Sequence, residues 1–179
     1  MAKKWVLGLV LATLVAGGVF AQHEPKNWIS GQVGLLGGGA GYERVLTPSL
    51  SVGGEVYWNS LFLFWNSFAL EGSVKFYPFQ GVFYVKGGLG FGTVTGTEDV
   101  SYAGYSYSWW YQTSGFLIDP GVGWKIDVGQ PGGFFIEPKV SVPIVLGKKE
   151  YDAWAGYKDN GQFKVGVNIL IAFGMGYAF

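Results

Sequence analysis

The sequence predicts an all-β fold, an eight-stranded antiparallel transmembrane β-barrel of the up-and-down type that follows an N-terminal signal peptide. Three observations predict it. Apolar residues recur at every second position over most of the chain, which is the period of a β-strand and not of a helix. Short and long connections alternate between these segments. The 179 residues include 31 glycines and are 49% hydrophobic but only 13% charged, whereas soluble domains carry roughly 25% charged residues.

The first segment has the layout of a secretory signal peptide. Lys3 and Lys4 precede an apolar run that ends in the small residue Ala21, so cleavage is expected after Ala21. An uncleaved membrane anchor is the alternative, but the run is marginal for the roughly 20 residues of a membrane helix. The predicted divisions are a signal peptide at 1–21, a short lead at 22–27 and one barrel domain at 28–179.

The first four strands are marked by large apolar residues that alternate with polar or small ones. In a strand this alternation places the two sets on opposite faces. The strands are expected at 28–36, 40–46, 49–58 and 67–77. Their apolar sets are Ile29, Val33 and Leu35 in the first, Leu50, Val52, Val56 and Trp58 in the third, and Phe68, Leu70, Val74 and Phe76 in the fourth. Arg44 falls on the apolar register of the second strand, where it could reach lipid headgroups near the membrane interface.

The last four strands are expected at 81–93, 113–127, 134–146 and 161–179. The last is the clearest, because every second residue from Phe163 to Phe179 is apolar. The fifth and sixth contain Phe83, Val85, Leu89 and Phe91, and Phe116, Ile118, Val122, Trp124 and Ile126. Pro120, Pro138 and Pro143 lie inside the sixth and seventh strands and cannot donate to a strand ladder. Either β-bulges accommodate these prolines, or the strand boundaries differ there.

The connections assign the two ends of the barrel. Short turns are expected at 47–49, 78–81 and 129–133, and longer links at about 59–66, 94–112 and 147–160. In outer-membrane barrels short turns are periplasmic and long loops lie outside. An even number of strands then places both termini on the side of the turns.

The apolar face is expected to point outward. An eight-stranded barrel has an interior just wide enough for side chains or one small ligand. Phe, Ile, Val and Trp crowd the apolar face, whereas glycine and alanine are common on the other face. A soluble, lipocalin-like barrel with its apolar face inward is the alternative. Two aromatic girdles are expected, with Trp58, Trp65, Trp109, Trp110 and Trp154 toward the long loops and Tyr77, Phe79, Phe134 and Tyr177 toward the turns.

The C-terminal strand carries the most specific resemblance. Phe173, Gly174, Tyr177 and Phe179 resemble the C-terminal signature of small eight-stranded bacterial outer-membrane β-barrels of the OmpA, OmpX and OmpW kind, and the stretch 41–47 is similar to their second strand. The resemblance implies an integral protein in the outer membrane of a diderm bacterium, surrounded by outer-membrane lipid. It also implies recognition of the last strand by the barrel-assembly machinery.

The residue types exclude several functions. There is no cysteine, and the single histidine, His23, precedes the barrel. Histidine-assisted nucleophilic catalysis is therefore unavailable inside the fold, and no cofactor or metal site is expected. The twelve basic and twelve acidic residues cancel, so no long-range field would recruit nucleic acid. We expect no enzyme.

The inward register carries a set of charged residues of both signs. These are Glu43, Glu55, Glu71, Asp119, Asp127, Glu137, Lys75, Lys86, Lys125, Lys139 and Lys164. One interpretation is a polar conduit for a solute or ion. The other is an interior plugged by ion pairs, because charges removed from water must be paired. A selective pore usually shows a ring of one sign, and the balance of charges here favours the plug.

The long links are the remaining candidates for function. Residues 95–114 contain aromatic side chains interleaved with serine, a composition typical of binding surfaces. The candidate contacts are Tyr102, Tyr105, Tyr107, Trp109, Trp110 and Tyr111. Tall hairpins that continue the fifth and sixth strands are a compatible interpretation. Residues 148–159 are expected to be solvated, and the apolar run Leu61–Trp65 either anchors in the outer leaflet or lines a lateral opening.

These observations lead to a non-enzymatic surface barrel whose role is structural or adhesive, through possible extracellular ligands of links 95–114 and 147–160. A narrow, OmpW-like channel for small or apolar solutes is the alternative. A soluble lipocalin-like binder is the third hypothesis.

Overall fold

The computed structural model describes residues 27–34, 37–61, 65–79, 81–102, 105–129, 133–151 and 163–179. The expected signal peptide, the lead before Asn27, Trp154 and most of segment 147–160 lie outside these ranges. The strands are β1 (Asn27–Gly34), β2 (Gly37–Thr47), β3 (Leu50–Leu61), β4 (Trp65–Phe76), β5 (Phe83–Tyr102), β6 (Tyr105–Trp124), β7 (Ile126–Val128), β8 (Phe134–Ser141), β9 (Ile144–Tyr151), β10 (Phe163–Val167) and β11 (Leu170–Ala178).

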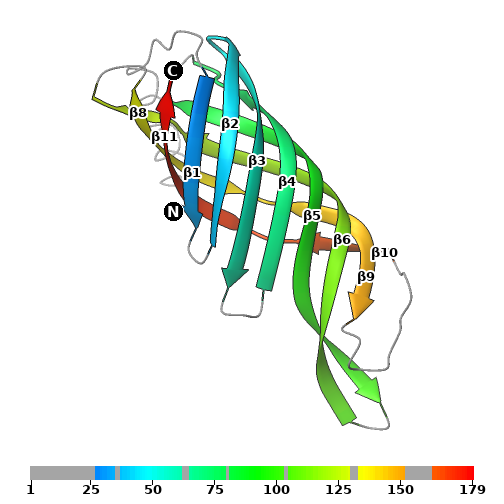
Figure 1. Cartoon of the computed structure of the whole chain (residues 1–179). Helices are drawn as coiled ribbons and strands as arrows, with labels where there is room; N and C mark the ends of the chain where they lie inside the picture. Colours follow the sequence, from blue (N-terminus) through cyan, green and yellow to red (C-terminus); the bar gives the residue numbers. More distant parts are fainter. Residues whose placement is uncertain are drawn as a thin grey trace, which may run out of the picture.

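The strands close into an antiparallel barrel. Each strand from β1 to β6 pairs with its neighbour in the chain, β6 pairs with both β8 and β9, and β11 pairs with β8 and β1 (Figure 1). The short segments β7, β9 and β11 continue β6, β8 and β10 across interruptions of one or two residues. The barrel therefore has eight strands, and the prediction of an all-β, eight-stranded antiparallel barrel is confirmed. No helix in the described ranges is long and apolar enough to cross a membrane.

None of the three prolines shifts the strand register, so the expected bulges were wrong. Pro138 pairs with Phe173 inside β8, whereas Pro120 and Pro143 lie where the pairing of β6 with β8 and β9 is interrupted. Ile118 pairs with Ile144 on one side of the interruption and Gly121 with Ser141 on the other, and these two pairs have the same register. The backbone N–H of Val142 still donates to the carbonyl of Pro120 at 2.9 Å. Proline removes a donor, and here the neighbouring residues keep the strands aligned. In the described strands, the register shifts between Val45 and Thr47, where β2 pairs with β3.

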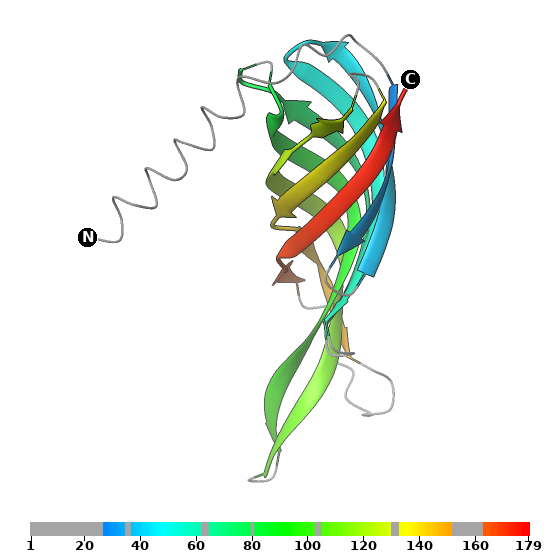
Figure 2. The same ribbon diagram turned by 90° about the vertical axis from the view of Figure 1, so that its left-hand side faces the viewer.

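The two ends of the barrel differ. The first and last described residues lie at one end, where Asn27 and Phe179 exchange two backbone hydrogen bonds of 2.9 Å. This turn end also holds the connections between β2 and β3, between β4 and β5, and between β7 and β8. At the opposite loop end, β5 and β6 extend well beyond the other strands as a twisted hairpin (Figures 1 and 2). The expected link 94–112 is therefore mostly paired strand, as the hairpin interpretation predicted.

Large apolar side chains cover the outside of the barrel. Those more than about half exposed include Ile29, Val33, Trp58, Leu70, Leu89, Phe91, Phe116, Ile169, Ile171 and Met175. This distribution excludes the alternative in which the apolar set faces inward. Arg44 is exposed and pairs opposite Asn27 at the turn end, which is the depth expected for a residue that reaches headgroups.

The turn-end girdle is only partly as predicted. Phe79, Phe134 and Tyr177 are 59%, 67% and 49% exposed, and the rings of Phe134 and Tyr177 contact edge to face. Tyr77 is 5% exposed and points into the barrel, so its place in the girdle was wrong. It follows Lys75 by two residues and shares its face, as the strand period requires.

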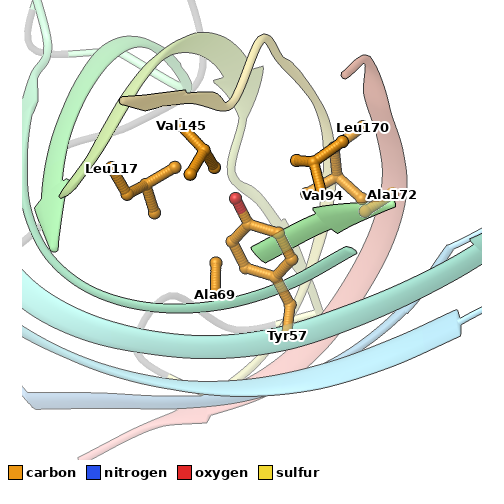
Figure 3. Packing of buried hydrophobic residues seen from close by; sticks show 7 residues of the cluster. All are labelled: Tyr57, Ala69, Val94, Leu117, Val145, Leu170 and Ala172. Carbon is orange, nitrogen blue, oxygen red and sulfur yellow. The ribbon is translucent and has the colours of Figure 1, made fainter. Parts of the chain in front are cut away.

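Two apolar clusters close the interior above and below a layer of charges. The cluster toward the loop end consists of Tyr57, Ala69, Val94, Leu117, Val145, Leu170 and Ala172, which converge from facing walls (Figure 3). The cluster toward the turn end consists of Trp28, Val45, Tyr77, Tyr84, Phe135 and Ala178. Buried side chains thus occupy the barrel on both sides of the charged layer.

Candidate functional site: the buried charge network

Five carboxylates and four lysines meet in the middle of the barrel. They come from β2, β3, β4, β5, β6 and β8, with one lysine between β6 and β7, and none is more than 6% exposed. The nine are Glu43, Glu55, Glu71, Asp119, Glu137, Lys75, Lys86, Lys125 and Lys139. Because the strands alternate, each residue of the inward register projects into the same narrow space.

Lys75 joins carboxylates from both walls on the turn side of the network. Its ammonium lies 2.6 Å from Glu137 and 2.9 Å from Glu43. Glu43 also accepts from Lys125 at 2.6 Å and from the Tyr77 hydroxyl at 2.9 Å. These contacts tie β4 to β2 and β8, which are far apart around the sheet. The charges therefore cross-brace the barrel.

Lys86 is the corresponding centre on the loop side. Its ammonium lies 2.8 Å from Asp119, 3.6 Å from Glu55 and in direct contact with Glu71. Glu55 also contacts Lys139, and it lies 3.4 Å from Lys75. Glu55 thus joins the two halves into one connected network. Removing one member would leave its partners charged and buried, which is the costly case for ion pairs.

Aromatic rings cap the network toward the turn end. The Lys125 ammonium lies 3.4 Å from the centroid of the Trp28 ring and 5.0 Å from that of Phe135. The Lys75 ammonium lies 4.7 Å from the Tyr84 ring, whose hydroxyl donates to Glu137 at 2.7 Å. Cation–π contacts are strongest where the cation is desolvated. The rings therefore add to the ion pairs and also separate them from the turn end.

Glycine makes room for these long side chains. A Cβ at Gly88 would overlap the carboxylate of Glu71 and lie 3.2 Å from the Cβ of Asp119. A Cβ at Gly123 would overlap the Tyr84 hydroxyl. In a barrel of eight strands the interior only just accommodates its side chains, so inward glycines opposite large residues are a packing requirement.

The network carries both signs and fills its space. Five carboxylates face four lysines, and the two signs alternate around Lys75 and Lys86. Glu71 Oε1 contacts the Lys86 ammonium, whereas Glu71 Oε2 and Asp119 Oδ1 lack a hydrogen-bond partner among the described residues. Those same residues hold no group of three or more His, Asp or Glu side chains placed to bind a metal ion. The arrangement is suited to bracing and closing the barrel.

The structure brings together nine of the eleven charged residues that the inward register predicted. The other two are half-buried: Asp127 lies in β7, and Lys164 in β10 places its ammonium 4.1 Å from the Tyr111 ring. Lys149, expected in a solvated loop, is instead 5% exposed and lies 4.7 Å from the same ring. Sequence reasoning also missed the inward Trp28, Tyr57, Tyr77 and Tyr84. Extending the strand period to these positions would have placed them inside.

The expected binding residues of link 95–114 lie on the hairpin. Tyr111 and Trp110 are half-buried near its base. The other four candidates, Tyr102, Tyr105, Tyr107 and Trp109, occupy paired backbone positions, and their side chains lie outside the described part. In the C-terminal signature, Phe173, Tyr177 and Phe179 are exposed on the outside and Gly174 is buried.

Comparisons with known proteins give a structural match at low sequence identity. No family model matches the sequence, and no curated protein matches it. One similar solved structure is the N-terminal β-barrel domain of Pseudomonas aeruginosa OprF. It shares 13% sequence identity with a TM-score of 0.43, and the match covers 88% of this chain and 100% of that one.

Proposed function

We propose that the chain is a non-enzymatic integral protein of the outer membrane of a diderm bacterium, which holds the β5–β6 hairpin outside the cell on a closed barrel. The belt of exposed apolar side chains on a closed antiparallel sheet carries this proposal. In lipid, every backbone polar group must find a partner within the protein, and a closed barrel provides this. The hairpin leaves from the end opposite Asn27 and Phe179, which is the outer end in such barrels.

A closed lumen fits this role better than a conduit. The charged layer lies between two apolar clusters, and its lysines are paired with carboxylates from facing strands. A pore selective for ions would favour a ring of one sign and space for water. The barrel then acts as a rigid support, and its role is structural or adhesive through the hairpin and segment 147–160.

The residue inventory supports the non-enzymatic part of the proposal. The chain has no cysteine and one histidine, His23, so the usual base for a serine or cysteine nucleophile is missing from the barrel. The buried carboxylates are engaged with lysines inside the barrel, away from any substrate.

The orientation can be tested with single cysteines, because the natural chain has none. Ser101→Cys lies on the hairpin and Ser49→Cys lies in the turn between β2 and β3. In intact cells, a membrane-impermeant maleimide should label position 101 and not position 49, and permeabilising the outer membrane should make both react. Labelling of position 49 alone in intact cells would reverse the orientation and overturn the proposal.

A further inference from the structure

Within the described part of the chain, the β5 strand of the hairpin has an open edge beyond the barrel. β5 pairs with β4 only as far as Val94, and β6 pairs with β9 only from Tyr111 onward. Among the described residues, 95–102 of β5 therefore pair only with 105–112 of β6, and 105–110 of β6 pair only with β5. In an antiparallel ladder every second residue directs its N–H and C=O away from its partner strand. Half of the residues at 95–102 therefore present both groups to the open edge of β5.

This edge is protected against strand pairing only by the charges of Glu98 and Asp99. Natural edge strands are also blunted by lysine, proline or bulges. Segment 95–102 contains neither lysine nor proline, and the pairing of β5 with β6 is unbroken from Phe83 to Tyr102. The segment is long and regular enough to receive an added strand of ordinary length.

The base of the hairpin is held in place. A Cβ at Gly96 would lie 2.8 Å from the Tyr111 hydroxyl, so the Tyr111 ring packs directly over the glycine. The ammonium groups of Lys149 and Lys164 lie 4.7 and 4.1 Å from the centroid of this ring. A fixed base lets the edge meet a partner without first becoming ordered, which lowers the entropic cost of binding.

Charge selects the partner. Residues 98 and 99 are Glu and Asp, and neither 95–102 nor 105–110 contains a basic residue. A second copy of this chain would bring like charges together at the same edge, which disfavours self-pairing. An extended segment with lysine or arginine would instead be attracted.

We propose that the open β5 edge at residues 95–102 binds an extended, lysine- or arginine-rich segment of a partner polypeptide by strand addition. Backbone hydrogen bonds would supply affinity, and the acidic pair at 98 and 99 would supply selectivity. This inference rests on the proposed function in one respect, namely that the hairpin lies outside the cell.

The test uses the full chain refolded in detergent micelles, with two eight-residue probes: a peptide alternating lysine with valine and one alternating glutamate with valine. A fluorophore on Thr97→Cys reports on the β5 edge, and the same fluorophore on Ser106→Cys reports on the β6 edge. The lysine peptide should bind saturably, with the larger signal at position 97. With ¹³C-labelled carbonyls it should show an infrared band of β-structure when bound. The double variant Glu98→Lys/Asp99→Lys should weaken binding at least tenfold.

Several outcomes would overturn the inference. They are equal binding of the glutamate peptide, unchanged affinity in the double variant, or binding without the β-structure band. Heat-modifiable migration shows that each variant remains a folded barrel. If the lysine peptide does not bind but position 101 is labelled on intact cells, strand addition is refuted. The proposed function then still stands.

Discussion

Replacing Lys86 by methionine should strongly destabilise the barrel. The Lys86 ammonium contacts Glu71 and lies 2.8 Å from Asp119, and the side chains of all three residues are at most 1% exposed. Methionine fills a similar volume but leaves these carboxylates buried without their cation. Breaking a buried pair in this way costs about 3–5 kcal/mol, which corresponds to roughly a hundred- to several-thousand-fold change in the unfolding equilibrium.

The assay is urea unfolding of the protein reconstituted in lipid vesicles, followed by tryptophan fluorescence and by heat-modifiable migration on gels. Lys148→Met is the matched control, because Lys148 is exposed and should change stability by no more than about 0.5 kcal/mol. Adding Glu71→Gln to Lys86→Met should recover part of the loss, because it removes one uncompensated charge. Equal, small effects of Lys86→Met and Lys148→Met would refute the claim that the network braces the barrel.

Three further predictions follow from the lipid belt, the packing and the hairpin. Leu89→Arg, in the middle of the belt, should lower the free energy of unfolding by about 2–4 kcal/mol, whereas Leu46→Arg, near the turn end, should lower it by about 0–1 kcal/mol. Unfolding in vesicles measures both, and equal costs would argue against a membrane belt. Gly90→Ala should cost about 1–3 kcal/mol, since its Cβ would overlap the backbone carbonyl of Leu70, whereas Gly87→Ala, with open space around it, should be neutral or stabilising in the same assay. Tyr111→Ala should speed proteolysis within 95–110 without unfolding the barrel, and unchanged cleavage would show that the ring does not hold the hairpin.

Most of this fold could be predicted from the two-residue period of its strands. Each of the eight strands buries one of its two faces, so alternation located the strands and separated lipid-facing residues such as Leu70 and Leu89 from inward ones such as Glu71 and Lys86. The turn end and loop end followed from the lengths of the connections. These features are local, because each depends on the residues of one segment of about ten positions.

Sequence reasoning was wrong about Lys149 and left other features open where the pattern is not local. Lys149 stands in a charged run that resembles a solvated loop, yet β9 continues to Tyr151 and carries it inside. The Tyr, Ser and Trp run of the hairpin is polar or aromatic on both faces, so it fits a binding loop as well as a strand. Which lysine meets which carboxylate depends on closure: Lys75 and Glu137 lie on β4 and β8, and no spacing in the sequence brings these residues together.

The central claim is that ion pairs and apolar clusters close this barrel, and conductance in a planar bilayer tests it most directly. The purified, refolded protein should insert with its heat-modifiable migration intact and remain silent across the voltage range. Lys86→Met in the same bilayer serves as the comparison, since it removes the central cation of the loop-side half. Discrete, reproducible openings of the unmodified protein would contradict the closed lumen and make the charged network a conduit.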